Sequence, residues 1–204
     1  MKGVYLVTDR RLLNGHSLEE VVSAAVNAGV CCVQLREKDI PTREFLDVAK
    51  RLKALMKQHS VPLVINDRID IAMAVDADGV HIGQSDMPYD LARKMLKPDA
   101  IIGLSVESWE DVELAQTLDV DYIGVSPVFA TPTKTDTKTS WGLEGIAKIK
   151  SYSKHALVAI GGININNIKS VIKSGADSVA VVSAICSAED PYKASAELIS
   201  SFTK

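Results

Sequence analysis

The sequence has few cysteines and no surplus of basic residues, and both features narrow the class of protein. Three cysteines in 204 residues, two of them adjacent at Cys31 and Cys32, form neither a disulfide framework nor a spaced metal motif. Free thiols fit a reducing compartment, so we expect a cytoplasmic protein. Lysine and arginine number 23 against 26 aspartates and glutamates, a formal charge of −3. That balance argues against a broad nucleic-acid-binding face.

Long hydrophobic runs are also missing. No apolar stretch approaches the ~20 residues that a membrane-spanning helix needs. Met1 is followed by the strand-like run Val4–Val7, without a basic segment and cleavage site, so we expect no signal peptide. With 47% hydrophobic and 24% charged residues, the composition is that of an ordinary globular protein. The length predicts a single domain over residues 1–204.

Short apolar runs recur along the whole chain, and each is followed by a stretch of helical periodicity. Such runs suit strands that are buried on both faces, as in a parallel sheet covered by helices. The sequence contains eight of them: Val4–Val7, Cys31–Leu35, Leu63–Ile65, Gly79–Ile82, Ile101–Ser105, Tyr122–Val125, Leu157–Ile160 and Ser178–Val182.

Helix signals occupy the segments between the runs. Ser17 and Glu20 have the spacing of a capping box, and Gly29 stands where that helix would end. Asn164 or Asn166 is expected to cap a later helix. Eight strand–helix alternations in about 200 residues predict an α/β fold of the (β/α)₈ TIM-barrel type. A doubly wound open sheet is the alternative that the same alternation allows.

Charged residues follow several of the predicted strands, and in a barrel the strand ends carry the functional residues. Arg36 and Lys38 after the second run, together with Lys134 after the sixth, describe a clamp for a polyanion. Asp67 and Asp86 follow the third and fourth runs and would face each other across the barrel mouth. Two carboxylates beside an anion clamp suit Mg²⁺.

Structural interpretations exist for the same residues. A charge at a strand end often pairs with a neighbour, and each aspartate could instead cap a helix.

Gly161 and Gly162 after the seventh run would let the backbone approach a ligand, and Ser183 after the eighth would complete a phosphate site. The histidines lack a partner carboxylate or metal-ligand spacing, so we interpret all four as structural or surface residues: His16, His59, His81 and His155.

Eight short motifs follow one another between about residues 4 and 186. They are YLVTD (5–9), VQLREK (33–38), INDR (65–68), DGVHIGQSD (78–86), GVSPVFATPTKTD (124–136), GLEGI (142–146), AIGGI (159–163) and VAVVSAI (179–185). Together they resemble the thiamine-phosphate synthase family. One position departs from the family pattern, since Ser126 stands where many members have glycine.

The resemblance implies an enzyme that joins 4-amino-2-methyl-5-hydroxymethylpyrimidine diphosphate to 4-methyl-5-(2-phosphoethyl)thiazole, or to its carboxylated form. The implied products are thiamine monophosphate and pyrophosphate, formed by a Mg²⁺-assisted dissociative displacement. Arg36, Ser105 and Lys134 are the implied catalytic residues, and Asp67 and Asp86 the implied metal ligands. The implied substrate contacts are Gln34, Arg36, Lys38, Asn66, Ser105 and Lys134 for the pyrimidine diphosphate, and Thr131, Thr133, Gly162, Val182 and Ser183 for the thiazole phosphate.

Two other functions are compatible with parts of the pattern. A related thiazole tautomerase shares the barrel, but its proposed acid–base histidine corresponds to Pro127 in this sequence. A catalytically silent sensor of a phosphorylated ligand could use the same scaffold, because fold alone does not determine function. The retained aspartate pair and cation clamp favour the synthase over both. We expect small-molecule substrates, no nucleic-acid or membrane partner, and a chain compatible with a homo-oligomer.

Overall fold

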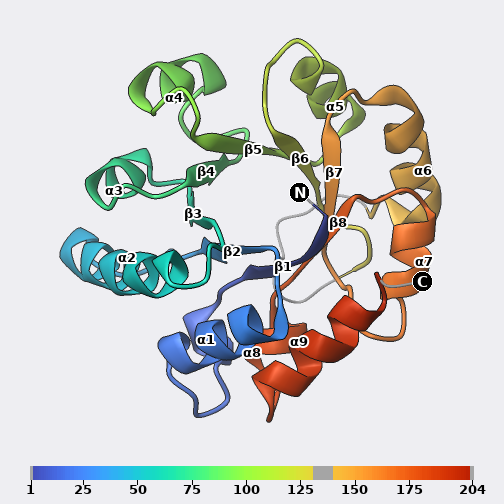
Figure 1. Cartoon of the computed structure of the whole chain (residues 1–204). Coiled ribbons are helices and arrows are strands. Elements are labelled where there is room, and N and C mark those ends of the chain that lie inside the picture. The colour runs from blue at the N-terminus through green and yellow to red at the C-terminus, as the bar shows by residue number, and fades with distance from the viewer. Residues whose placement is uncertain (1, 131–139, 203–204) are drawn as a thin grey trace.

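A closed barrel of eight parallel strands, surrounded by helices, forms the fold (Figure 1). The computed structural model describes residues 2–130 and 140–202. The strands are β1 (Gly3–Val7), β2 (Cys32–Leu35), β3 (Leu63–Asn66), β4 (Gly79–Ile82), β5 (Ile101–Val106), β6 (Tyr122–Val125), β7 (Ala156–Ile160) and β8 (Ser178–Val181). Each predicted run forms one of these strands, and no strand end differs from its prediction by more than one residue.

Closure of the sheet decides between the two predicted architectures. β1 pairs in parallel with β8, with Gly3 opposite Ser178 and Leu6 opposite Val181. Every other strand pairs with its neighbour in sequence. The first and last strands of a doubly wound open sheet would not meet in this way. The predicted (β/α)₈ barrel is therefore confirmed.

Helices follow the strands and cover the outside of the barrel (Figure 1). They are η1 (Arg10–Leu12), α1 (Leu18–Ala28), α2 (Thr42–Lys57), α3 (Ile69–Ala74), α4 (Tyr89–Met95), α5 (Trp109–Ala115), α6 (Gly142–Tyr152), α7 (Ile168–Lys173), α8 (Ser183–Cys186) and α9 (Pro191–Ser200). Among the described residues, none of the helices has both the length and the apolar content needed to cross a bilayer.

The helix caps match the sequence signals at α1 but not at α7. The Ser17 side chain accepts from the Glu20 amide, Glu20 accepts from the Ser17 amide, and α1 ends at Gly29 in a left-handed conformation. The expectation that Asn164 or Asn166 caps the later helix is wrong. The Asn164 side chain instead accepts from the Asn166 amide at 2.9 Å and closes a turn. α7 begins after Asn167, at Ile168.

Alternation along each strand divides the core into two layers. One set of strand residues packs outward against the helices, and the other set fills the barrel interior. The interior layer contains Tyr5, Val7, Cys32, Val64, Tyr122, Val158 and Ala180, all buried. Glycines make room for the rings: a Cβ at Gly103 would lie 2.1 Å from Cζ of Tyr122, and a Cβ at Gly124 would lie 2.8 Å from Cε1 of His81.

We expect Gly103→Ala to destabilise the fold by about 2–3 kcal/mol, because the added methyl group must displace a buried tyrosine ring. Urea titration of the purified variant measures the change in the free energy of unfolding. Gly15→Ala is the matched control, since a Cβ at Gly15 meets nothing within 4 Å. We expect Gly15→Ala to lower the free energy of unfolding by only about 1 kcal/mol, because alanine tolerates the positive φ at this position less well than glycine does. Equal losses in the two variants would contradict a steric role for Gly103.

Candidate active site at the carboxyl ends of the strands

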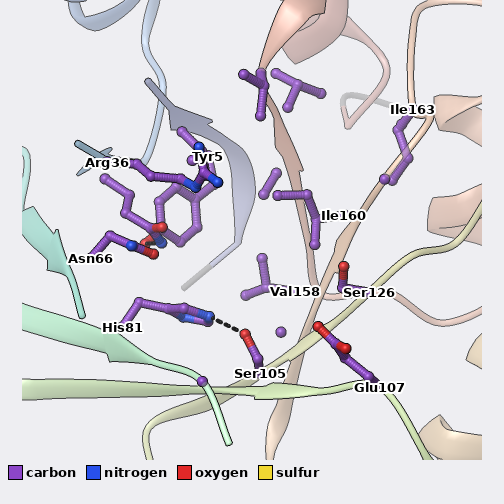
Figure 2. A pocket seen from close by; sticks show the side chains of 18 of the residues that line it. Tyr5, Arg36, Asn66, His81, Ser105, Glu107, Ser126, Val158, Ile160 and Ile163 are labelled. Carbon is purple, nitrogen blue, oxygen red and sulfur yellow. Dashed lines mark hydrogen bonds between the residues drawn. The ribbon is translucent and has the colours of Figure 1, made fainter. Parts of the chain in front are cut away.

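A cavity of about 660 Å³ opens at the carboxyl ends of the strands and extends into the barrel (Figure 2). Residues expected at the site from the sequence that line this cavity are Gln34, Arg36, Lys38, Asn66, Asp67, Asp86, Ser105, Gly162, Val182 and Ser183. Thr131, Thr133 and Lys134 lie outside the described residues. The barrel thus brings together side chains from β2 to β8 at one mouth.

Strand alternation explains which side chains reach the cavity. Gln34 and Arg36 are two residues apart at the end of β2, so both face inward. Ser105 and Glu107 have the same spacing at the end of β5. Figure 2 shows Arg36, Asn66, Ser105 and Glu107 gathered around one opening. The polar lining contributed by β2 and β5 thus follows from the two-residue period of a strand.

Asp67 and Asp86 form an acidic pair beside a lysine. Lys38 Nζ donates to Asp67 Oδ2 at 2.5 Å, and the Gly83 amide donates to Asp86 Oδ2 at 2.7 Å. Neither aspartate caps a helix, because α3 begins after Arg68 and α4 after Pro88. The helix-cap interpretation of the two carboxylates therefore does not hold.

The backbone at Asp67 is itself unusual. Asp67 has φ of +60°, a left-handed conformation that aspartate and asparagine tolerate better than most residues. Strained backbone of this kind collects at functional sites, where the surrounding structure holds it in place. Here the conformation follows directly after β3, and the Asp67 amide donates to the His81 carbonyl of β4 at 2.8 Å. The neighbouring strand therefore holds Asp67 at the mouth.

Electrostatics at this pair favour a cation. Burial raises the pKa of the Asp86 carboxyl, the Gly83 amide opposes that shift, and the nearby Asp67 carboxyl raises the pKa further. A positive ion beside Asp86 would relieve this penalty on its ionised form. Mg²⁺ takes oxygen ligands and is often held by one or two carboxylates together with phosphate oxygens and water. No cluster of three or more acidic, histidine or cysteine ligands occurs among the described residues, so their side chains offer at most these two carboxylates to such an ion.

Contacts with Thr8 and Asp9 hold Arg36 at the cavity. Its amide donates to the Thr8 hydroxyl at 3.1 Å, and its Nη1 lies 3.9 Å from Oδ2 of the buried Asp9. Hydrogen bonds from Arg11 lower the pKa of Asp9, with burial opposing them, so the carboxylate that faces Arg36 stays ionised. The guanidinium is therefore oriented while its donors remain available to an anion.

Asn66 supplies a second indication of ligand binding. Its Nδ2 atom is buried, lines the cavity and has no hydrogen-bond partner among the described residues. A buried amide without a partner is costly in a folded protein, and a bound ligand would offset that cost. The orphaned donor lies on the same side of the cavity as the charged residues of β2 and β3.

The glycine pair after β7 has a structural role that sequence reasoning did not identify. A Cβ at Gly162 would lie 2.8 Å from the Phe129 Cβ and 2.9 Å from the Ala130 carbonyl oxygen. Gly161 accepts from the Phe129 amide at 3.0 Å. Close packing of the β6 and β7 loops therefore already requires glycine here, apart from any approach of the backbone to a ligand.

His81 is the main site residue that sequence reasoning missed. It lines the cavity from β4, and its Nε2 atom lies 2.8 Å from the Ser105 hydroxyl (Figure 2). The signal was present in the strand GVHI, where buried Val80 and Ile82 alternate with the histidine. Glu107 and Ser126 also line the cavity. Ser126, the departure from the family pattern, thus adds a hydroxyl to the wall.

Comparison with known proteins identifies close relatives. The family model described as thiamine monophosphate synthase matches residues 4–185. Thiamine-phosphate synthase of Albidiferax ferrireducens is 55% identical over 96% of this chain and 89% of its own length. The enzyme of that name in Leptospira biflexa is 53% identical over 99% of this chain and 98% of its own. A solved structure of thiamine phosphate pyrophosphorylase from Pyrococcus furiosus aligns with a TM-score of 0.90, at 41% identity, over 98% of this chain and 95% of that one.

Proposed function

Because this chain belongs to the thiamine monophosphate synthase family, we propose that its barrel cavity is where a pyrimidine diphosphate and a thiazole phosphate are joined. Family membership makes the chain a transferase of thiamine biosynthesis. The substrates we propose are 4-amino-2-methyl-5-hydroxymethylpyrimidine diphosphate and 4-methyl-5-(2-phosphoethyl)thiazole or its carboxylated form. Thiamine monophosphate and pyrophosphate would leave the site, together with carbon dioxide when the carboxylated thiazole is the substrate.

The observation that carries this assignment is the uneven distribution of charge around the cavity. Arg36 and Lys38 from β2 lie with Asp67 and Asp86 on one side. Among the described residues, the side formed by β7 and β8 offers Gly162, Asn164 and the Ser183 hydroxyl instead of charged side chains. A diphosphate with its cation suits the charged side, and a single phosphate suits the other. Thr131, Thr133, Val182 and Ser183 are the further contacts we assign to the thiazole phosphate.

The proposed chemistry needs charge stabilisation and positioning, without a general base. The bond between the pyrimidine methylene carbon and the bridging oxygen breaks, and its electron pair leaves with the diphosphate. The thiazole nitrogen then uses its lone pair to form the new carbon–nitrogen bond. Arg36 and Lys134 neutralise the charge that develops on the diphosphate, and Ser105 contacts the same substrate. Holding both substrates in line lowers the entropic part of the barrier.

We propose Asp67 and Asp86 as the residues that hold Mg²⁺. When bound, the ion would act as a Lewis acid on the leaving diphosphate. Lys38, which contacts Asp67 in this structure, lies close enough to share the same anion. Gln34 and Asn66 supply side-chain amides that can orient the pyrimidine diphosphate. A cytoplasmic location is also part of the proposal and is supported by the free thiols of Cys31, Cys32 and Cys186.

A two-substrate assay tests the proposed function. The purified protein is mixed with both substrates and Mg²⁺, and thiamine phosphate and pyrophosphate are quantified separately. We expect equal amounts of the two products, and no product when a chelator removes Mg²⁺. Conversion of the carboxylated thiazole alone, without thiamine phosphate, would indicate a tautomerase. Binding of either phosphate without turnover would indicate a sensor, and both results would overturn the proposal.

A further inference from the structure

A chain of hydrogen bonds crosses the barrel interior along the wall of the cavity. Gln34 Nε2 donates to the Tyr5 hydroxyl at 2.9 Å, and the Tyr5 hydroxyl lies 2.9 Å from that of Tyr122. The Tyr122 hydroxyl lies 3.0 Å from His81 Nδ1, and His81 Nε2 lies 2.8 Å from Ser105 Oγ. The two ends of the chain, Gln34 and Ser105, are residues that we assign to the pyrimidine diphosphate.

Counting the protons along this chain of hydrogen bonds shows which group donates and which accepts at each contact. Burial raises the pKa of both tyrosines well above the ordinary value, so each phenol keeps one proton. Because Tyr5 accepts from Gln34, its own proton needs another acceptor, and the Tyr122 oxygen lies within reach. Were Tyr122 the donor instead, the Tyr5 proton would turn to the Cys32 sulfur, which lies within hydrogen-bonding reach but is a weaker acceptor than a phenol oxygen.

The same count continues to Ser105. Tyr122 accepts from Tyr5 and therefore donates its own proton to His81 Nδ1. A neutral imidazole that accepts at Nδ1 carries its proton on Nε2 and donates it there. Ser105 Oγ then accepts from His81, and the serine proton is left to point elsewhere. The cavity lies in front of this hydroxyl (Figure 2).

We propose that His81 and Tyr122 are positioning residues, which hold Ser105 as a hydrogen-bond donor toward the substrate by fixing the Nε2–H tautomer of His81. The inference about the tautomer stands on the network alone, whereas its kinetic consequence rests on the proposed function. Diphosphate oxygens and pyrimidine ring nitrogens are acceptors, so a serine held as a donor matches that substrate. The reverse polarity would require Tyr5 to donate to a turned Gln34 carbonyl or to the Cys32 sulfur, and Ser105 would then donate to His81.

Stacking supports the assignment of a fixed ring. The His81 and Tyr122 rings are stacked, with centroids 5.5 Å apart and planes inclined by 24°. A Cβ at Gly124 would collide with the His81 ring, and a Cβ at Gly103 with the Tyr122 ring. The two rings therefore occupy spaces that glycines on β5 and β6 leave open, and they hold each other in the orientation that the hydrogen bonds require.

Nitrogen-15 NMR of the substrate-free protein, labelled on histidine, tests the tautomer directly. We expect the wild-type His81 ring to be neutral with its proton on Nε2. The chain contains four histidines, and His155 serves as an internal reference because its Nε2 lies 2.8 Å from the Ala115 carbonyl, which can only accept. His81→Gln removes one signal and so assigns it. A proton on Nδ1 in the wild-type protein would overturn the proposal.

Tyr122→Phe then tests whether the Tyr122 hydroxyl is what fixes the His81 tautomer. This variant keeps the ring but removes the donor to Nδ1, so we expect a mixture of His81 tautomers. Tyr5→Phe is the matched control: it removes a buried hydroxyl from the same network but leaves Tyr122 able to donate to His81, so the tautomer should persist. Thermal unfolding confirms that both variants are folded. An unchanged tautomer in Tyr122→Phe would contradict the proposal, and so would a mixture in Tyr5→Phe.

Kinetics test the consequence for Ser105. We expect Tyr122→Phe to lower kcat about tenfold, with the KM for the pyrimidine diphosphate changed by less than about twofold, because misdirecting one donor affects the transition state most. A purely structural role would lower the melting temperature and leave kcat per folded molecule unchanged. That result, in a variant whose tautomer has changed, would overturn the positioning role while leaving the proposed function standing.

Discussion

Replacing Asp67 or Asp86 by asparagine should lower kcat/KM by about two orders of magnitude or more, with little loss of stability. Each change removes one of the two carboxylates that we assign to Mg²⁺. The double variant should be little worse than either single one, because residues that serve one function are not additive. Steady-state assays of all three variants across a Mg²⁺ titration measure these effects.

The geometry of both positions explains why the fold should tolerate these changes. Asparagine adopts the left-handed backbone of Asp67 readily. At position 86 an amide oxygen can still accept from the Gly83 amide, as Oδ2 does at 2.7 Å. Loss of the contact between Lys38 and Asp67 is offset by relief of the repulsion between the carboxylates. We therefore expect the free energy of unfolding to change by less than about 1 kcal/mol.

Asp70→Asn is the matched control for the acidic pair. Asp70 lies three residues after Asp67, on α3, where it pairs with Arg68 and does not line the cavity. Its replacement should leave activity unchanged. A readout independent of turnover is the rise in melting temperature when Mg²⁺ and pyrophosphate are added together, which the Asp67 and Asp86 variants should lose. Retained activity with an unchanged Mg²⁺ requirement in those variants would refute the metal assignment.

Arg36→Gln should reduce kcat/KM by about two to three orders of magnitude, through loss of a charge-assisted contact to the leaving diphosphate. The effect should appear with the pyrimidine diphosphate and leave the affinity for the thiazole phosphate nearly unchanged. Steady-state kinetics with each substrate varied in turn separates the two. Titration calorimetry with pyrophosphate and Mg²⁺ reports the binding defect directly.

Arg11→Gln is the control that separates this role from a structural one. Arg36 and Arg11 both approach Asp9, Arg36 at 3.9 Å and Arg11 at 2.7 Å, but only Arg36 lines the cavity. The Arg11 side chain is 67% exposed. If the importance of Arg36 lay in its pairing with Asp9, the Arg11 variant would lose at least as much activity. We expect its kcat/KM to stay within about twofold of the wild-type value.

Much of the fold could be predicted because the relevant signals are local. Apolar runs such as Val4–Val7 and Tyr122–Val125 mark strands buried on both faces, and the capping box at Ser17 marks the start of α1. Site residues such as Arg36 and Asp86 could be found for a related reason. They follow strands directly, and the strand ends of a parallel barrel meet at one mouth. Where several asparagines compete near α7, the local signal was ambiguous and the predicted cap was wrong.

Only the tertiary structure decided how these residues act on one another. Closure of the barrel by β1 and β8 brings Tyr5, Gln34, His81, Ser105 and Tyr122 into one hydrogen-bonded chain, although they come from four strands besides β1. No local pattern encodes a contact between residues 117 positions apart, such as the two tyrosines. No local pattern encodes the contact of Gly162 with Phe129 and Ala130 either, for which the absence of a side chain at Gly162 leaves the space. Contacts of this kind depend on the distance between strands in space, which the closed barrel determines and the order of residues along the chain does not.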